Sequence, residues 1–344
     1  MAHRGVVHGG VTRRQELGLL DVSRGVPAVT SGRVFSQTGW GCQAELARAA
    51  VGAKGTQVPQ LWLCGGTGGL PPVYQRLVVE GAEPRLIRRH GCTVGVRYED
   101  EHAEYCLLTG VLPPDTQATR EAQTTAVFEG IEDALTDAGM TFAHVARTWL
   151  YMDRILEWYN PFNRARDAFF RSRKVYDGLV PASTGIGSAN LCGSAITACA
   201  IAVKPKKRGA VTVEAVPSPL QCAALQYGSS FSRAVEIATP EYRTLMVSGT
   251  ASIEPGGATA HVDDVPRQIQ LTMDVIEAIL VSRGMGWKDA TRTVMYLKKA
   301  SYMGAWQAWL KAHRLEALPL VTIEADVCRD DLLVELEVDT VVKV

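Results

Sequence analysis

Hydrophobic positions along the chain follow two different periods, and each period predicts one kind of element. Apolar residues recur at i, i+3 and i+4 in four segments, as Val127, Ile131 and Leu135 do in the first of them. These segments predict helices over 122–138, 158–171, 267–283 and 302–313. Shorter apolar runs between them predict strands over 105–111, 147–152, 195–203, 244–253, 291–297, 321–326 and 332–341.

The predicted elements occur twice in the same order, and one stretch of sequence shows why. Residues 131–151 and 276–296 are identical at eight of 21 positions, where unrelated segments share about one or two. We interpret this match as an internal duplication. Each copy then has the order β-β-α-β-α-β-β, with a Gly-Met break after its first helix.

This order predicts an α+β fold in which each copy forms a mixed sheet with two helices on one face. The other face of each sheet must also be buried, so we expect the two copies to pack together and to leave clefts at their junction. The predicted organisation is an N-terminal extension over 1–70, a first domain over 71–208 and a second domain over 209–344.

Composition excludes several classes of function. Lys plus Arg and Asp plus Glu are equal at 36 each, so no net charge attracts the protein to nucleic acid or to an anionic membrane. No apolar run reaches the roughly 20 residues of a membrane helix, and the N-terminus lacks the apolar core of a signal peptide. The eight cysteines include no CxxC pair. We therefore expect a reduced, cytoplasmic protein, and we interpret the basic run 204–208 as a solvated linker.

No motif indicates a cofactor. The glycine-rich segment 64–69 lacks the pattern of a phosphate-binding loop and is interpreted as a turn, and no nucleophile elbow is present. The nearest approach to a metal cluster is His261-Val262-Asp263-Asp264, which is typical of a solvated turn. We expect neither a metal nor an organic cofactor.

Acidic side chains alternate along the last predicted strand. The period of two places Leu333, Glu335, Glu337 and Asp339 on one face of it. This face either is solvated or lines a cleft. In a cleft, burial and the nearby Glu337 would raise the pKa of Glu335 and suit that residue to proton donation near neutral pH.

Alignment of the two copies suggests that only one of them has this acid. When Cys192 is aligned with Cys328, Cys199 of the first copy lies opposite Glu335 of the second. The second copy therefore has a carboxylate where the first has a thiol. From this difference we expect one active site per chain, built on the second copy.

Arginines near the strand 147–152 are the complementary candidates. Arg147 opens this strand and Arg154 follows its end, and either could present forked donors to a carboxylate. The counterpart of Arg147 in the second copy is Arg292, so the repeat does not say which of the two meets a substrate. The arginines of the next helix are expected mostly on the surface: Arg164, Arg166, Arg171 and Arg173.

Four motifs, in this order along the chain, give the sequence a specific family resemblance. They are YNPFNRARDAFF at 159–170, PASTGIG at 181–187, SGTASI at 248–253 and VCRDDLLVELE at 327–337. From about residue 60 to its end, the chain resembles the chorismatase family. Each copy is similar to the Rid (YjgF) fold.

The resemblance implies cleavage of chorismate with release of its enolpyruvyl group as pyruvate, without a cofactor. Glu335 matches the family's general acid, which protonates the methylene carbon of the enol ether. Cys328 matches the position that helps to select the product, and a cysteine there resembles the branch that forms 3-hydroxybenzoate. Arg147 and Arg154 match arginines that hold the carboxylates of the substrate.

Two further residues complete the set expected to bind substrate: Tyr151 at the end of the repeated stretch, and Gly249 within SGTASI. Chorismate is the expected partner, with a role in secondary metabolite biosynthesis. The sequence leaves the oligomeric state and the downstream pathway open.

Three alternatives remain at this point. One is a hydrolytic chorismatase, in which water traps the cation and gives a dihydroxycyclohexadienoate. Another is a Rid-type imine deaminase, although Leu320 and Thr184 stand where that class uses an arginine to bind the substrate carboxylate. The last is a non-catalytic protein that kept the fold and binds a small molecule, because fold alone does not fix function.

Overall fold

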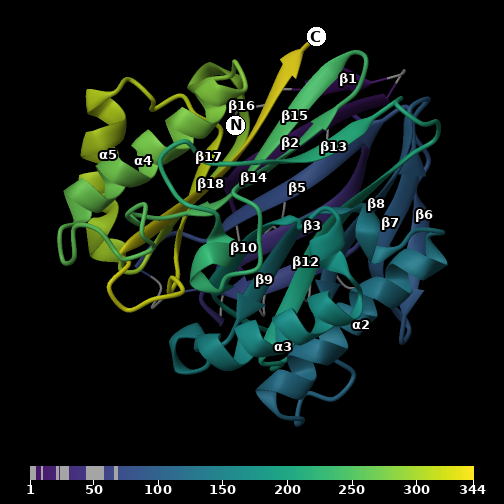
Figure 1. The fold of residues 1–344 in the computed structure, drawn as a ribbon, viewed down its shortest axis with the longest axis horizontal. Helices are drawn as coiled ribbons and strands as arrows, with labels where there is room; N and C mark the ends of the chain where they lie inside the picture. The colour runs from purple at the N-terminus through teal and green to yellow at the C-terminus, as the bar shows by residue number, and fades with distance from the viewer. Residues whose placement is uncertain (1–4, 9–10, 21–22, 24–30, 44–57, 66–68) are drawn as a thin grey trace.

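The computed structural model describes residues 5–8, 11–20, 23, 31–43, 58–65 and 69–344. They form three mixed six-stranded sheets and four α-helices. Figure 1 shows the helices on the outside of the molecule and the strands between them. The α+β prediction is confirmed, but the number of sheets is three rather than two.

The bounds of the elements follow the sheet order. The first sheet contains β1 (Gly5–His8), β2 (Val11–Leu19), β5 (Val73–Glu80), β3 (Arg33–Gly41), β4 (Gln60–Cys64) and β11 (Ala189–Asn190). The second contains β10 (Ala182–Gly187), β9 (Val145–Met152), β12 (Ile196–Pro205), β8 (Ala103–Val111), β7 (Cys92–Glu99) and β6 (Arg85–Arg89). The third contains β13 (Thr212–Val216), β14 (Ala234–Ala238), β15 (Tyr242–Thr250), β18 (Val334–Lys343), β16 (Ala290–Leu297) and β17 (Leu320–Glu324).

The four helices agree with the predicted segments to within two residues at each end. They are α2 (Arg120–Asp137), α3 (Tyr159–Ser172), α4 (Val265–Ser282) and α5 (Met303–Ala312). The Gly-Met break ends α2 and α4 in the same way. Gly139 and Gly284 adopt positive φ angles of +72° and +69°, a conformation that favours glycine. The methionine after each glycine donates its backbone N–H to the carbonyl five residues earlier, which closes the helix end.

The N-terminal sheet corrects the predicted organisation. In it, β5 pairs antiparallel with β3, which pairs parallel with β4. The other two sheets contain the same arrangement. In the second sheet, β12 pairs antiparallel with β9, which pairs parallel with β10. In the third, β18 pairs antiparallel with β16, which pairs parallel with β17. Residues 1–70 are therefore not a separate extension, because β5 over 73–80 completes their sheet. The sequence match between the two copies did not reveal this N-terminal unit. Residues 2–84 contain no methionine, so the Gly-Met break of the other two copies does not occur in them.

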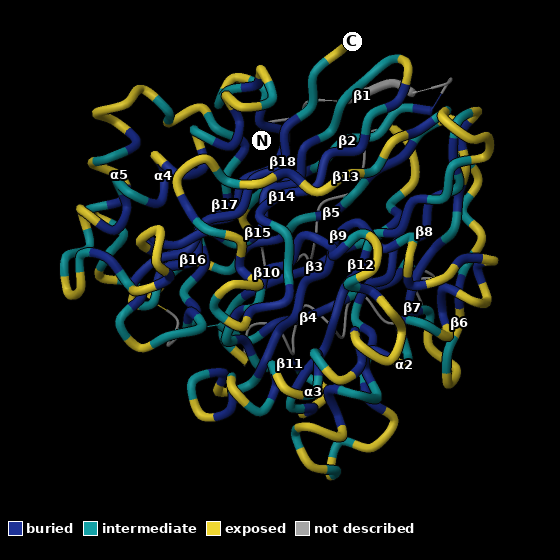
Figure 2. Tube along the Cα trace, viewed as in Figure 1, coloured by how far each residue is buried: buried dark blue, intermediate teal, exposed yellow. Residues whose placement is uncertain are grey.

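The three sheets bury their inner faces against one another. One apolar cluster there joins Phe35, Tyr105 and Met246, one residue from each sheet. The opposite faces of the second and third sheets pack against helices, α2 and α3 on one and α4 and α5 on the other. Figure 2 shows buried positions following the strands through the centre, with exposed positions on loops and outer helix faces.

Strand register also corrects the alignment of the two copies. Tyr151 lies opposite Thr197, and its counterpart Tyr296 lies opposite Glu335. The structural counterpart of Glu335 is therefore Thr197 rather than Cys199, which corresponds to Glu337 instead. The alignment through the two cysteines was two residues out of register, because the loops before β12 and β18 differ in length.

Segments expected to be turns or linkers have simple structural roles. Asp264 caps α4 by accepting a hydrogen bond from the backbone N–H of Arg267 at 3.0 Å, so the His261 segment is a helix-capping turn. The run 204–208 ends β12, and Lys206 pairs with Glu99 at 3.0 Å. Part of the glycine-rich segment 64–69 lies outside the described residues. Among the described residues, none of the helices has the length and apolar character that a membrane span requires.

Candidate active site

The acidic face of β18 is buried. Glu335, Glu337 and Asp339 are 5%, 0% and 7% exposed, and Val334, Leu336 and Val338 on the other face pack in the core beneath the helices of the second copy. The predicted alternation is confirmed, and the hypothesis of a solvated acidic face is wrong. Each of the three carboxyl groups therefore needs a specific partner or a neutral form.

Glu337 is held by donors from both copies. Arg147 reaches it from the first copy with Nη2 at 2.5 Å, and Arg292 reaches its other oxygen from the second. Three further donors complete the shell: Trp149 Nε1 at 2.9 Å, Thr184 Oγ1 at 2.5 Å and Tyr296 OH at 3.1 Å. Burial by itself would raise the pKa of Glu337, but the two guanidinium charges outweigh it and lower that pKa. Glu337 is therefore ionised.

Glu335, two residues earlier on the same face, has the opposite environment. Burial and the negative charge of Glu337 raise its pKa to about 8, and the more distant charge of Arg147 opposes that rise only in part. The carboxyl group thus keeps its proton at neutral pH. Two neighbouring carboxyl groups with pKa values pushed apart are a common basis for assigning acid and base roles in enzymes.

Glycine at position 249 makes room for this carboxyl group. Gly249 lies where β15 and β18 shift register, and a Cβ there would collide with Oε1 of Glu335. Its backbone N–H donates to Thr184 Oγ1 at 2.9 Å. Within the SGTASI motif, this glycine therefore allows the strand backbone to approach the carboxyl group of Glu335 closely.

Glu335 lies at one end of a cavity between the second and third sheets. The cavity has a volume of about 40 Å³ and adjoins an outer cleft of about 630 Å³. Five residues line both spaces: Tyr159, Tyr227, Ser229, Cys328 and Arg329. The inner cavity therefore opens outwards past α3 and the loops around 227 and 328, and the two spaces together are large enough for a small-molecule ligand.

Three arginines line the inner cavity, and none forms a salt bridge with a described carboxylate. Arg166 of α3 is 3% exposed, donates to Asn163 Oδ1 at 2.7 Å and leaves its buried Nε without a partner. Arg233 donates to the carbonyl of Cys222 at 2.9 and 3.0 Å, and Arg329 donates to that of Gly257 at 2.8 Å. Burial lowers the pKa of Arg166, as expected for a cation without a counter-ion.

Cys328 lines the same cavity, beside Glu335 and Tyr159. Burial, and then the nearby Glu335, raise the pKa of its thiol to about 12, so the sulfur is a neutral group rather than a thiolate nucleophile. Burial likewise raises the pKa of Tyr159. Both side chains can donate a proton in a hydrogen bond at neutral pH.

The structure brings together three of the six residues expected at the site: Glu335, Cys328 and Gly249. Arg147 and Tyr151 do not line this cavity. Arg147 binds Glu337, and Tyr151 lies in the inner core with its ring 6.5 Å from that of Trp40. Arg154 does not line this cavity either, because its side chain is 64% exposed and lies near Asp153 and Glu157.

The three arginines that line the cavity were not among the residues predicted for the site. Arg166 was expected on the surface with the other arginines of its helix, yet it is buried. One signal was available, because Phe162, Arg166, Phe169 and Phe170 recur at i, i+4, i+7 and i+8 and so place Arg166 on the buried face of α3. Arg233 and Arg329 lie outside helices, where no periodic pattern applies.

Comparisons with known proteins agree with this architecture. Residues 85–202 match the family described as "Chorismatase FkbO/Hyg5-like, N-terminal", and the match begins where β6 begins. A 3-hydroxybenzoate synthase from Streptomyces hygroscopicus is 29% identical over 307 residues, which are 78% of this chain and 85% of that protein. A chorismatase from the same organism is 27% identical over 216 residues, 56% of this chain and 60% of that protein.

A solved structure extends the agreement to the whole fold. The crystal structure of a chorismatase superposes with a TM-score of 0.72 at 19% identity, and the alignment covers 97% of this chain and 99% of that one. The N-terminal sheet is therefore part of the shared architecture.

Proposed function

We propose that the chain is a chorismatase, because residues 85–202 match that family and two relatives of this kind align with the chain, and that it cleaves chorismate to 3-hydroxybenzoate and pyruvate with Glu335 as the proton donor. The observation that carries this proposal is the pairing of a protonated carboxyl group with three arginines that have no carboxylate partner among the described residues. Such a cavity attracts an anion and can protonate it. Chorismate has two carboxylates and an enol ether whose methylene carbon accepts a proton.

Arg166 is the strongest candidate for binding a substrate carboxylate. Its buried guanidinium forms no salt bridge with a described carboxylate, and its Nε has no hydrogen-bond partner among the described residues, so a substrate carboxylate would give it a forked acceptor. Arg329 lies where the inner cavity meets the outer cleft, so it can receive the second carboxylate. In this arrangement the enol ether lies between the two, within reach of Glu335.

The proposed reaction balances without an external reactant. Proton transfer from Glu335 to the methylene carbon forms an oxocarbenium ion and leaves Glu335 as a carboxylate. The ring hydroxyl of the same substrate, rather than water, then attacks the ring carbon that carries the ether oxygen, so that this C–O bond breaks, pyruvate leaves and the ring rearranges to the phenol. Aromatisation frees a ring proton that returns Glu335 to its acid form. The atoms of chorismate are those of 3-hydroxybenzoate and pyruvate together, so no net water is consumed.

Cys328 is proposed to favour this intramolecular route. Its neutral thiol occupies the cavity wall next to Glu335, where the sulfur fills space that an attacking water would need and offers only a weak hydrogen-bond partner. The 3-hydroxybenzoate synthase relative supports this branch. The chorismatase relative keeps the hydrolytic outcome as the second candidate.

One assay tests both the reaction and the branch. Purified protein is incubated with chorismate, pyruvate is quantified enzymatically, and the ring product is identified by NMR. We expect one pyruvate and one 3-hydroxybenzoate for each chorismate consumed. A dihydroxycyclohexadienoate in place of the hydroxybenzoate would establish the hydrolytic reaction instead, and absence of pyruvate would overturn the proposal.

A further inference from the structure

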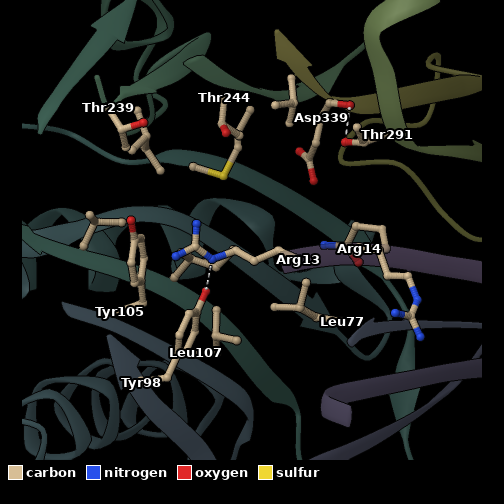
Figure 3. A pocket seen from close by; sticks show the side chains of 16 residues that line it. Arg13, Arg14, Leu77, Tyr98, Tyr105, Leu107, Thr239, Thr244, Thr291 and Asp339 are labelled. Atoms are coloured by element: carbon tan, nitrogen blue, oxygen red, sulfur yellow. Dashed lines mark hydrogen bonds between the residues drawn. The ribbon is translucent and has the colours of Figure 1, made fainter. Parts of the chain in front are cut away.

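A second cavity lies where the inner faces of the three sheets meet. It has a volume of about 120 Å³ and shares no lining residue with the Glu335 cavity. Arg13 reaches it from β2 of the first sheet, Tyr105 from β8 of the second and Asp339 from β18 of the third. Figure 3 shows Asp339, Thr244 and Thr239 on one side of this central cavity and Arg13 and Tyr105 on the other.

Apolar side chains form much of the wall. They are Leu77, Leu107, Ile201, Val203, Ile237 and Met246. An apolar cavity of about 150 Å³ is known to take up a benzene ring, so this space of about 120 Å³ has the size for a single small ring. The ring would be buried mainly by the hydrophobic effect.

Arg13 provides a cation at one side. It donates from Nε to Tyr98 OH at 2.9 Å and from Nη2 to Asp100 at 2.6 Å, and its guanidinium carbon lies 4.1 Å from the ring centre of Tyr105. These contacts fix the guanidinium at the cavity wall. They leave Nη1 to a ligand, since the hydrogen bonds of Arg13 to described residues use its other nitrogens.

Asp339 provides an unsatisfied acceptor at the opposite side. Its side chain is 10% exposed, and Arg292 approaches Oδ2 at 3.5 Å. The other oxygen, Oδ1, is buried and has no hydrogen-bond partner among the described residues. A buried carboxyl group with an unpartnered oxygen is costly, and a donor bound in the cavity against this carboxyl group would offset that cost.

We propose that the central cavity binds a small monocyclic phenol, with the ring between the apolar walls and its hydroxyl donating to the carboxyl group of Asp339. A carboxylate on such a ring, as in a hydroxybenzoate, is accommodated on the side of Arg13. Binding here depends only on residues of the central cavity, so it is expected whether or not the protein cleaves chorismate.

Methionine NMR can test binding at this site directly. Met246 lines the central cavity, whereas no methionine lines the Glu335 cavity. The full chain is labelled with methyl-13C methionine, the Met246 signal is assigned with Met246→Leu, and 3-hydroxybenzoate is titrated. We expect a saturable shift of the Met246 signal with a Kd of about 1 mM or tighter. Absence of a shift at 10-fold higher concentration, roughly 10 mM, overturns the proposal.

Two comparisons test the chemistry of recognition. Benzoate has the ring and the carboxylate but not the hydroxyl, so we expect it to bind at least about tenfold more weakly than 3-hydroxybenzoate, because Asp339 stays unpaired. Equal binding of the two would reject the role of Asp339. Thr244→Phe places a ring in the cavity and should abolish saturation by 3-hydroxybenzoate, and an unchanged titration curve in this folded variant would reject the location.

Discussion

The equivalent central strands of the two copies, β12 and β18, differ mainly in charge. β18 directs Glu335, Glu337 and Asp339 inward, and register places Thr197, Cys199 and Ile201 at the same positions of β12. Both copies nevertheless keep their arginine, Arg147 in one and Arg292 in the other. In the structure both arginines bind the same carboxylate, that of Glu337.

This difference teaches that the candidate site belongs to both copies. The second copy supplies the acid and its charged neighbour, while the first supplies Arg147, Thr184 and the buried face of α3. The first copy, whose strand β12 lacks these carboxylates, therefore still contributes residues that the site needs. Four predictions test the comparison, starting with the largest effect.

Glu335→Gln should lower kcat for chorismate cleavage by at least 10²- to 10⁴-fold, because the amide cannot supply the proton. The matched change in the other copy is Thr197→Gln, and we expect it to leave kcat within about threefold of the wild type if the protein folds. Circular dichroism would check that both variants are folded. Near-normal turnover by Glu335→Gln would reject Glu335 as the acid.

Arg166→Met should reduce kcat/KM for chorismate by about 10- to 100-fold, the size expected for loss of one charge-assisted hydrogen bond. Arg154→Met is the control, because that side chain is exposed and outside the cavity, and its kcat/KM should not change. If Arg154→Met were the more damaging substitution, the carboxylate would bind near the end of β9 rather than on α3.

The rate should depend on pH through Glu335, which acts only while it is protonated. Its pKa of about 8 means that kcat/KM is steady at lower pH and falls about tenfold per pH unit well above 8. Glu337→Gln removes the negative charge that helps to raise this pKa, so the decline should begin at lower pH. The exposed Glu277→Gln should leave the profile unchanged. A Glu337→Gln profile shifted to higher pH would contradict the coupling.

Cys328→Ala should change the product more than the rate. Its smaller side chain makes room for water beside Glu335, so we expect a measurable fraction of dihydroxycyclohexadienoate by NMR while total pyruvate release stays within about threefold. The buried thiol of the other copy offers a control, Cys199→Ala, which should leave the product ratio unchanged. If Cys328→Ala and Cys199→Ala gave the same ratio of products, Cys328 would not be the residue that selects between the two reactions.

Local pattern in the sequence was sufficient for the four helices, for seven of the strands and for one side of the site. Helices and strands followed from periods of 3.6 and 2, because each element buries one face. The duplication followed from the identity of residues 131–151 and 276–296. The alternation on β18 and the family motifs were enough to propose Glu335, Cys328 and Gly249, which the structure places on one cavity.

Only the tertiary structure decided which groups meet and which carboxyl group keeps its proton. Glu337 is ionised because Arg147, 190 residues earlier in the chain, lies within 2.5 Å of it, whereas Glu335 forms no salt bridge with a described arginine and keeps its proton. The same packing buries Arg166 and completes a third sheet from the N-terminal residues. Burial and charge proximity are properties of neighbours in space, and the order of residues along the chain does not specify those neighbours.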